Sequence, residues 1–125
     1  MVEDDPDHRR ALLLTLRLGG YRPEECGSGE DALDQIGQNS AIPGAIDAVV
    51  LDVRLPGMDG LQVLTKLRHQ MSTQTLPVVL ISAHASIPNS VQSDEYASFV
   101  AKPFHPDQLL ERLDEMLTGR TEERR

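Results

Sequence analysis

The sequence contains few cysteine and aromatic residues, and these shortages exclude several kinds of site. Cys26 is the single cysteine among 125 residues, which rules out an internal disulfide and any zinc or iron–sulfur site built from several cysteines. Aromatic residues make up 3% of the chain, so stacking platforms for single-stranded nucleic acid are missing. Neither a membrane-spanning apolar run nor a signal peptide is recognisable. We therefore expect a soluble, cytoplasmic protein.

Positive charge is also scarce. Twelve Lys and Arg residues stand against twenty Asp and Glu residues, which gives a formal net charge of −8. This excess repels phosphate backbones and anionic lipid surfaces, so direct binding to nucleic acid or to a membrane is not expected. The length predicts one domain, which we place at residues 1–117 and which is followed by a charged C-terminal tail at residues 118–125.

Apolar runs that alternate with helical patterns predict the fold class. Residues 46–52 and 77–82 are nearly continuous apolar runs, which are typical of strands buried on both faces, and residues 98–101 form a shorter run. Asp5 is expected to cap a helix that begins at Pro6. Together these patterns predict an α/β fold with a doubly wound parallel sheet and helices on both faces.

Polar side chains end four of the predicted strands. Glu3 and Asp4 follow the first strand, Asp52 and Ser82 end two central ones, and Lys102 follows the last. The carboxyl ends of parallel strands meet at one edge of a sheet, where such folds bind ligands. Three neighbouring carboxylates repel one another unless they are paired, and Mg²⁺ prefers carboxylate oxygens and water as ligands. A magnesium site at this edge is therefore expected.

These segments resemble the receiver domain of two-component response regulators over nearly the whole chain. The resemblance is carried by Glu3-Asp4, by the segment Leu51–Gly60 (LDVRLPGMDG), by Ser82-Ala83 and by Lys102-Pro103-Phe104. It implies a chemotaxis-regulator-like (βα)5 fold, in which five parallel strands have the flavodoxin-like order 2-1-3-4-5.

The resemblance also implies a reaction. Asp52 is the expected phosphoacceptor, taking a phosphoryl group from a phosphohistidine of a histidine kinase or phosphotransfer protein and later losing it by hydrolysis. Mg²⁺ is expected to be held by Asp4 directly, by Glu3 through water, by Asp52 and by the backbone carbonyl of Arg54. The Lys102 ammonium pairs with phosphoryl oxygens. Apart from this self-phosphorylation and autodephosphorylation, the chain is not expected to be an enzyme.

A switch is implied by the same resemblance. The Ser82 hydroxyl donates to the phosphoryl group, and Phe99 swings inward, where it has no hydroxyl group to expose or to hydrogen-bond. Arg54 and His84 follow the phosphoacceptor and Ser82 by two residues, positions that tune phosphoryl lifetime in the family. An ordinary role as exposed loop residues is an equally weighted interpretation for these two.

Two other functions remain as alternatives. One alternative is a receiver-like module that binds partners without taking phosphate. The other is a Mg²⁺-dependent phosphatase with an aspartyl nucleophile. Such phosphatases need a second Asp two residues after the nucleophile, and Arg54 stands there instead. The sequence names neither the kinase nor the output partner.

The start of the sequence departs from the family pattern. Met1 and Val2 alone precede the acidic pair, whereas the family has a strand of several apolar residues there. Residues 21–26 are expected to form an edge strand because Pro23 has no N–H group for a ladder. Because two apolar residues precede Glu3, we expect a short first strand and further apolar residues upstream in the natural protein.

Overall fold

The computed structural model describes residues 1–3, 5–39, 46–55, 57–82 and 92–123. The helices are α1 (Pro6–Leu18), α2 (Gly29–Asn39), α3 (Gly60–Arg68) and α5 (Pro106–Glu123), with a short 3₁₀ helix η1 (Met71–Thr73). The strands are β1 (Val49–Asp52), β2 (Val78–Ser82) and β3 (Ala97–Ala101).

The sheet is parallel, and within the described residues its regular strands have the order β1, β2, β3. On the free edge of β1, Val2 forms isolated parallel bridges to both Leu51 and Cys26. The order across the sheet is therefore Cys26, Val2, β1, β2, β3, which confirms the predicted 2-1-3-4-5 arrangement. The expected first two strands are present as single-residue bridges at Val2 and Cys26, and Pro23 has no N–H group with which to extend the second of them.

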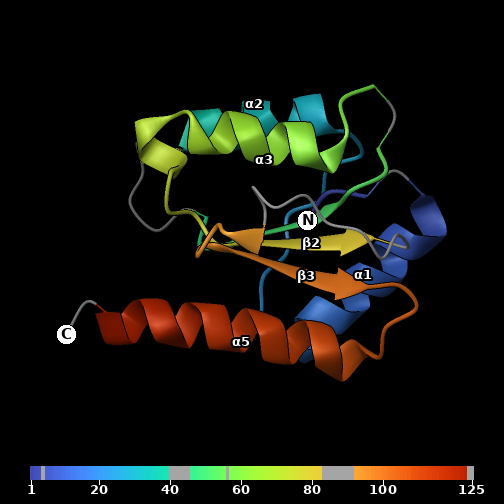
Figure 1. The fold of residues 1–125 in the computed structure, drawn as a ribbon. Coiled ribbons are helices and arrows are strands. Elements are labelled where there is room, and N and C mark those ends of the chain that lie inside the picture. The colour runs from blue at the N-terminus through green and yellow to red at the C-terminus, as the bar shows by residue number, and fades with distance from the viewer. Residues whose placement is uncertain (4, 40–45, 56, 83–91, 124–125) are drawn as a thin grey trace.

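Helices cover both faces of the sheet, as predicted, with α2 and α3 over one face and α1 and α5 over the other (Figure 1). Alternate strand residues supply the two cores. The core under α2 and α3 includes Val49, Leu51, Val78 and Leu80 with Ala32, Ile36, Val63, Leu64 and Leu67. The core under α1 and α5 includes Val50, Val79, Ile81 and Val100 with Leu12, Leu16, Leu109 and Leu113. Continuous apolar runs are thus explained by burial on both faces.

The helix starts follow local capping chemistry. The prediction for Asp5 is confirmed: its side chain accepts hydrogen bonds from the backbone N–H groups of Asp7 and His8. Asp59 caps α3 in a reciprocal capping box with Gln62. These caps fix where the chain leaves the sheet edge and enters each helix.

Residues 118–123, which were expected to belong to a charged tail, are helical. Helix α5 continues to Glu123, because no proline interrupts it and most of its last residues tolerate helix. The sequence also predicts a short helix between Ala83 and Asp94, interrupted at Pro88, but residues 83–91 lie outside the described part of the chain. Of the helices within the described ranges, none has the length and apolar character needed to cross a membrane.

Candidate functional site

The carboxyl ends of the strands bring Glu3, Asp52, Ser82 and Lys102 to one edge of the sheet. Glu3 follows the Val2 bridge, Asp52 and Ser82 are the last residues of β1 and β2, and Lys102 comes directly after β3. Backbone hydrogen bonds hold these ends in register: Asp52 N donates to Val2 O at 3.1 Å, and Lys102 N donates to Ser82 O at 2.8 Å. Parallel pairing therefore places these side chains close together.

Asp52 lies between two hydrogen-bond donors. Lys102 Nζ donates to Asp52 Oδ2 at 2.5 Å, and the backbone N–H of Arg54 donates to Asp52 Oδ1 at 2.8 Å. Lys102 Nζ also lies 3.7 Å from Glu3 Oε2. Glu3 and Asp52 are 2% and 4% exposed, so this ion cluster is largely shielded from water. One ammonium thus faces two buried carboxyl groups.

Burial and crowding shift the proton equilibria of this cluster. Burial, together with the neighbouring Asp52 carboxyl, raises the pKa of Glu3 from 4.5 to about 7. Partial burial alone would lower the pKa of the Lys102 ammonium, but the hydrogen bond to Asp52 and the charges of Asp52 and Glu3 raise it above its ordinary value. Lys102 therefore stays charged, whereas Glu3 is poised between its two forms near neutral pH.

Gly60, the first residue of α3, packs closely against the backbone of Asp52 and Val53 at the end of β1. Gly60 N donates to Val53 O at 2.8 Å, and a Cβ atom at residue 60 would lie 2.5 Å from Asp52 O. Only a residue without a side chain fits this approach. From sequence, residues 56–60 are predicted only to form a turn. Neither this contact nor the Asp59 cap was predicted, although the Asp59-x-x-Gln62 spacing signals a capping box.

The carboxyl groups suit a hard divalent cation. Glu3 Oε2 is buried without a hydrogen-bond partner among the described residues, which leaves an acceptor directed at the cluster. In the part of the chain that the structure describes, no group of three or more His, Cys, Asp or Glu residues has a metal-binding arrangement. Asp4, the third expected carboxylate, lies outside the described residues. Glu3 and Asp52 therefore form two-thirds of the expected acidic set.

The remaining expected residues have different placements. Ser82 is buried at the end of β2, and Phe99 is half-buried in β3, where it packs against the core under α2 and α3. Arg54 is exposed, and its contact with Asp52 is made by its backbone N–H. His84 lies outside the described residues. The structure thus brings Glu3, Asp52 and Lys102 into contact and adds Ser82 at the same edge.

Comparisons with known proteins agree with this arrangement. A family model described as the response regulator receiver domain matches residues 1–114. The chain is 34% identical over 113 residues to the C4-dicarboxylate transport transcriptional regulatory protein DctD of Rhizobium meliloti, covering 89% of this chain and 23% of that protein. It is 38% identical over 115 residues to the uncharacterized transcriptional regulatory protein YkoG of Bacillus subtilis, covering 90% and 47%. The chain thus spans less than half of these relatives.

Two solved structures have the same fold and a similar length. The chemotaxis protein CheY4 of Vibrio cholerae superimposes with a TM-score of 0.78 and 26% identity, covering 93% of this chain and 94% of that one. A sensor protein from Polaromonas sp. JS666 superimposes with a TM-score of 0.82 and 29% identity, covering 94% of both chains. The predicted family and fold are both confirmed by these matches.

Proposed function

The chain belongs to the response regulator receiver family, and on that premise we propose that Asp52 is its phosphoacceptor in a two-component phosphorelay. The observation that carries this proposal is the Asp52 carboxylate itself, which is buried at the carboxyl edge of the sheet and bound by the Lys102 ammonium at 2.5 Å. A shielded carboxylate beside a fixed positive charge matches the needs of phosphoryl transfer, which depends mainly on positioning and charge neutralisation.

The proposed donor is a phosphohistidine of a histidine kinase or of a phosphotransfer protein. A carboxylate oxygen of Asp52 forms a new bond to phosphorus as the phosphorus–nitrogen bond breaks, and the electron pair of that bond stays on the imidazole. Both Asp52 oxygens accept hydrogen bonds in the unphosphorylated protein, from Lys102 and from Arg54 N. Lys102 then transfers its contact to the incoming phosphoryl oxygens, where it stabilises the charge that develops.

We assign the Mg²⁺ cofactor to the same edge of the sheet. Glu3, Asp4, Asp52 and the backbone carbonyl of Arg54 are the proposed ligands, and the buried Glu3 Oε2, which accepts no hydrogen bond from the described residues, supports this set. When bound, Mg²⁺ neutralises charge on the phosphoryl oxygens. Glu3 then holds the site in its deprotonated form, and the Lys102 ammonium balances the remaining acidic charge.

Phosphorylation is proposed to act on partner binding through Ser82 and Phe99. It adds about −1.5 to −2 charges and three acceptor oxygens beside the buried Ser82 hydroxyl. Phe99 packs on the strand next to Ser82 and offers an apolar surface whose burial changes with the switch. Arg54 and His84 are proposed to adjust the lifetime of the aspartyl phosphate.

The output of the switch is proposed to be a change in protein–protein contact, with the output partner unidentified. The net charge of −8 disfavours direct nucleic-acid or membrane binding by this domain. Relatives described as transcriptional regulators carry the matching region as 23% and 47% of their length, so in them other parts of the chain have room for such binding. A cytoplasmic location fits the buried free thiol of Cys26.

A small acyl-phosphate donor tests the phosphoacceptor directly. With Mg²⁺ and acetyl phosphate, the protein is expected to gain the mass of one phosphoryl group, and hydroxylamine is expected to remove it. Asp52→Asn loses the adduct, whereas the matched control Asp59→Asn keeps it because Asn also caps helices well.

The same assay separates the two alternatives. Absence of any adduct in the folded protein would indicate a partner-binding module that takes no phosphate. Repeated turnover of unrelated phosphomonoesters would instead indicate a phosphatase, a reaction that Arg54 at the position of the second Asp disfavours.

A further inference from the structure

The loop between β1 and α3 starts directly after the proposed phosphoacceptor, and its described residues are 53–55 and 57–59. Backbone hydrogen bonds fix its two ends. Val53 N donates to Ile81 O at 2.9 Å, and Gly60 N donates to Val53 O at 2.8 Å. These bonds tie the loop to the end of the sheet and to the start of α3, and they do not reach its middle at residues 57 and 58.

The middle of the loop is bound by a side chain of α2. Glu30, in the first turn of that helix, accepts a hydrogen bond at Oε1 from the Met58 backbone N–H at 3.2 Å. The two residues are 28 positions apart in the sequence, so this is a tertiary contact. Helices α2 and α3 lie side by side over one face of the sheet (Figure 1). The start of α2 therefore supports the loop that leads into α3.

Two glycines allow this close approach, one on each side of the contact. A Cβ atom at residue 57 would lie 3.2 Å from Glu30 Oε1, and φ at this glycine is +74°. A Cβ atom at residue 29 would lie 2.7 Å from Val63 Cγ2 and 3.0 Å from Met58 O. Side chains at either position would push α2 and the loop apart. The fit of the two backbones thus supports the hydrogen bond independently.

The tethered loop also carries two backbone groups of the proposed site. Arg54 N donates to Asp52 Oδ1 at 2.8 Å, and the Arg54 carbonyl is a proposed Mg²⁺ ligand. Backbone groups have no side-chain rotamers, so the path of the loop alone decides where they lie. A loop that is already held at Met58 keeps residue 54 in place before the metal and the phosphodonor arrive. Such prior ordering lowers the entropic cost of assembling a reactive site.

We propose that Glu30 is a positioning residue for phosphorylation of Asp52, acting through its hydrogen bond to the Met58 N–H. The proposal rests on the phosphoacceptor role proposed for Asp52. The sequence gives no sign of this role, because an acidic residue in the first turn of a helix is already favoured by the helix dipole. Asp31, the next residue, has the same charge in the same turn and is exposed. It therefore provides a matched control.

Hydrogen exchange in the metal-free protein tests the tether itself. Glu30→Ala is expected to speed exchange at the Met58 amide about fivefold, the effect of losing one hydrogen bond of ordinary strength. Exchange at the Arg54 amide is expected to rise with it. Glu30→Gln keeps both amides slow, since its side-chain oxygen accepts the same bond. Asp31→Ala leaves both unchanged.

Magnesium binding and phosphorylation test the consequence for the site. In Glu30→Ala, the affinity for Mg²⁺, followed by NMR titration with magnesium chloride, is expected to fall about threefold. The rate of phosphorylation by acetyl phosphate at saturating Mg²⁺ is expected to fall about fivefold. Glu30→Gln stays within about twofold of the unaltered protein in both measurements. Because Gln and Ala remove the same charge, the difference between these two variants isolates the hydrogen bond.

Several outcomes would overturn the proposal. Unchanged exchange at Met58 and Arg54 in Glu30→Ala would remove the tether. Equal slowing of phosphorylation by Glu30→Gln and Glu30→Ala would assign the effect to charge, and equal slowing by Asp31→Ala would assign it to the helix start. An adduct that forms at the same rate in Glu30→Ala refutes the role of Glu30 alone. Absence of any adduct in the unaltered protein would instead refute the phosphoacceptor role of Asp52.

Discussion

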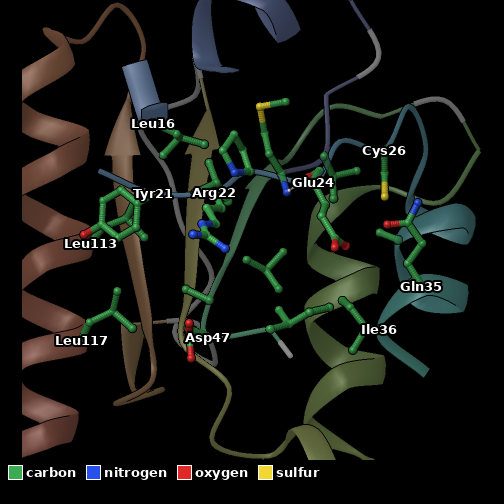
Figure 2. Close-up of a pocket in the computed structure, with 18 of the residues that line it drawn as sticks. Leu16, Tyr21, Arg22, Glu24, Cys26, Gln35, Ile36, Asp47, Leu113 and Leu117 are labelled. Carbon is green, nitrogen blue, oxygen red and sulfur yellow. Dashed lines mark hydrogen bonds between the residues drawn. The ribbon is translucent and has the colours of Figure 1, made fainter. Parts of the chain in front are cut away.

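The two ends of one sheet differ sharply in this protein. At the carboxyl end, Glu3, Asp52 and Lys102 form a compact, buried ion cluster. At the amino end of the same strands, Met1 borders a cavity of about 510 Å³ that is lined by both apolar and charged residues (Figure 2). Val2 bridges both Cys26 and Leu51 and thereby places Glu3 at the site, whereas the cavity lies by the opposite end of β1. The comparison separates the residues that arrange the chemistry from those that supply stability.

If the carboxyl end provides the chemistry, removing its positive charge has the largest effect. Lys102→Ala is expected to slow phosphorylation of Asp52 by acetyl phosphate about 10²–10³-fold, because the charge that develops on the phosphoryl oxygens loses its fixed partner. The rate of adduct formation by intact mass measures this. Lys66→Ala, which removes an exposed lysine in the last turn of α3, is the matched control and leaves the rate unchanged. Similar rates for both variants would contradict the role given to Lys102.

The carboxyl end is also tightly packed, unlike the cavity. Gly60→Ala is expected to destabilise the protein by about 1–3 kcal/mol, because the new Cβ meets Asp52 O and Val53 Cα. Gly37→Ala in α2 has the opposite expected sign, a gain of about 0.5–1 kcal/mol, since its Cβ meets nothing within 4 Å and alanine favours helix. Urea unfolding of both variants checks the pair. Equal effects would show that the loop after Asp52 has room to relax.

The ion cluster makes the stability of the metal-free protein depend on pH. The pKa of Glu3 is about 7 in the folded protein against 4.5 ordinarily, so the folded state binds this proton more tightly than the unfolded state. Its contribution is fully present below about pH 4.5 and is lost as the pH rises through about 7. Thermal midpoints measured with a chelator are therefore expected to fall across this window.

Glu3→Gln tests the source of that slope. The variant cannot lose the proton, so the decline in thermal midpoint between about pH 4.5 and about pH 7 becomes shallower. Glu111→Gln, on an exposed position of α5, serves as the control and keeps the original slope. An identical slope in all three proteins would show that Glu3 does not titrate in this range.

A loss of stability smaller than that of Gly60→Ala is expected at a contact that borders the cavity. The Tyr21 hydroxyl donates to Asp114 and so ties the segment after α1 to α5. Tyr21→Phe is expected to cost about 1 kcal/mol. Little further loss is expected when Asp114→Asn is added, because both changes remove the same bond. A double-mutant cycle by urea unfolding measures the coupling, and fully additive losses would contradict it.

The fold could be predicted from the sequence because its signals are local and repeated. Continuous apolar runs end in polar residues at the same edge, and the Asp5-Pro6 start gives the first helix its cap. Strand order followed from family resemblance and is confirmed by the Val2 bridges to Cys26 and Leu51. The end of α5 was placed too early, since charged residues were interpreted as a tail although they also form helix readily.

The site was predictable in its residue types but not in its contacts. The sequence indicates that Glu3, Asp52 and Lys102 approach one another, yet the direct bond from Lys102 to Asp52 depends on side-chain rotamers. The close approach of residue 60 to Asp52 O is equally hidden, because it depends on how the chain turns back over the strand end. The cavity could not be foreseen in its dimensions, since these depend on helices distant in sequence.

Locating the phosphoryl group on the chain tests the central claim most directly. After reaction with acetyl phosphate and Mg²⁺, borohydride reduction converts an aspartyl phosphate to homoserine, which peptide mapping by mass spectrometry assigns to one position. The account predicts homoserine at residue 52 and at no other aspartate. Homoserine at Asp59 or another carboxylate in the folded protein, with none at residue 52, would contradict it.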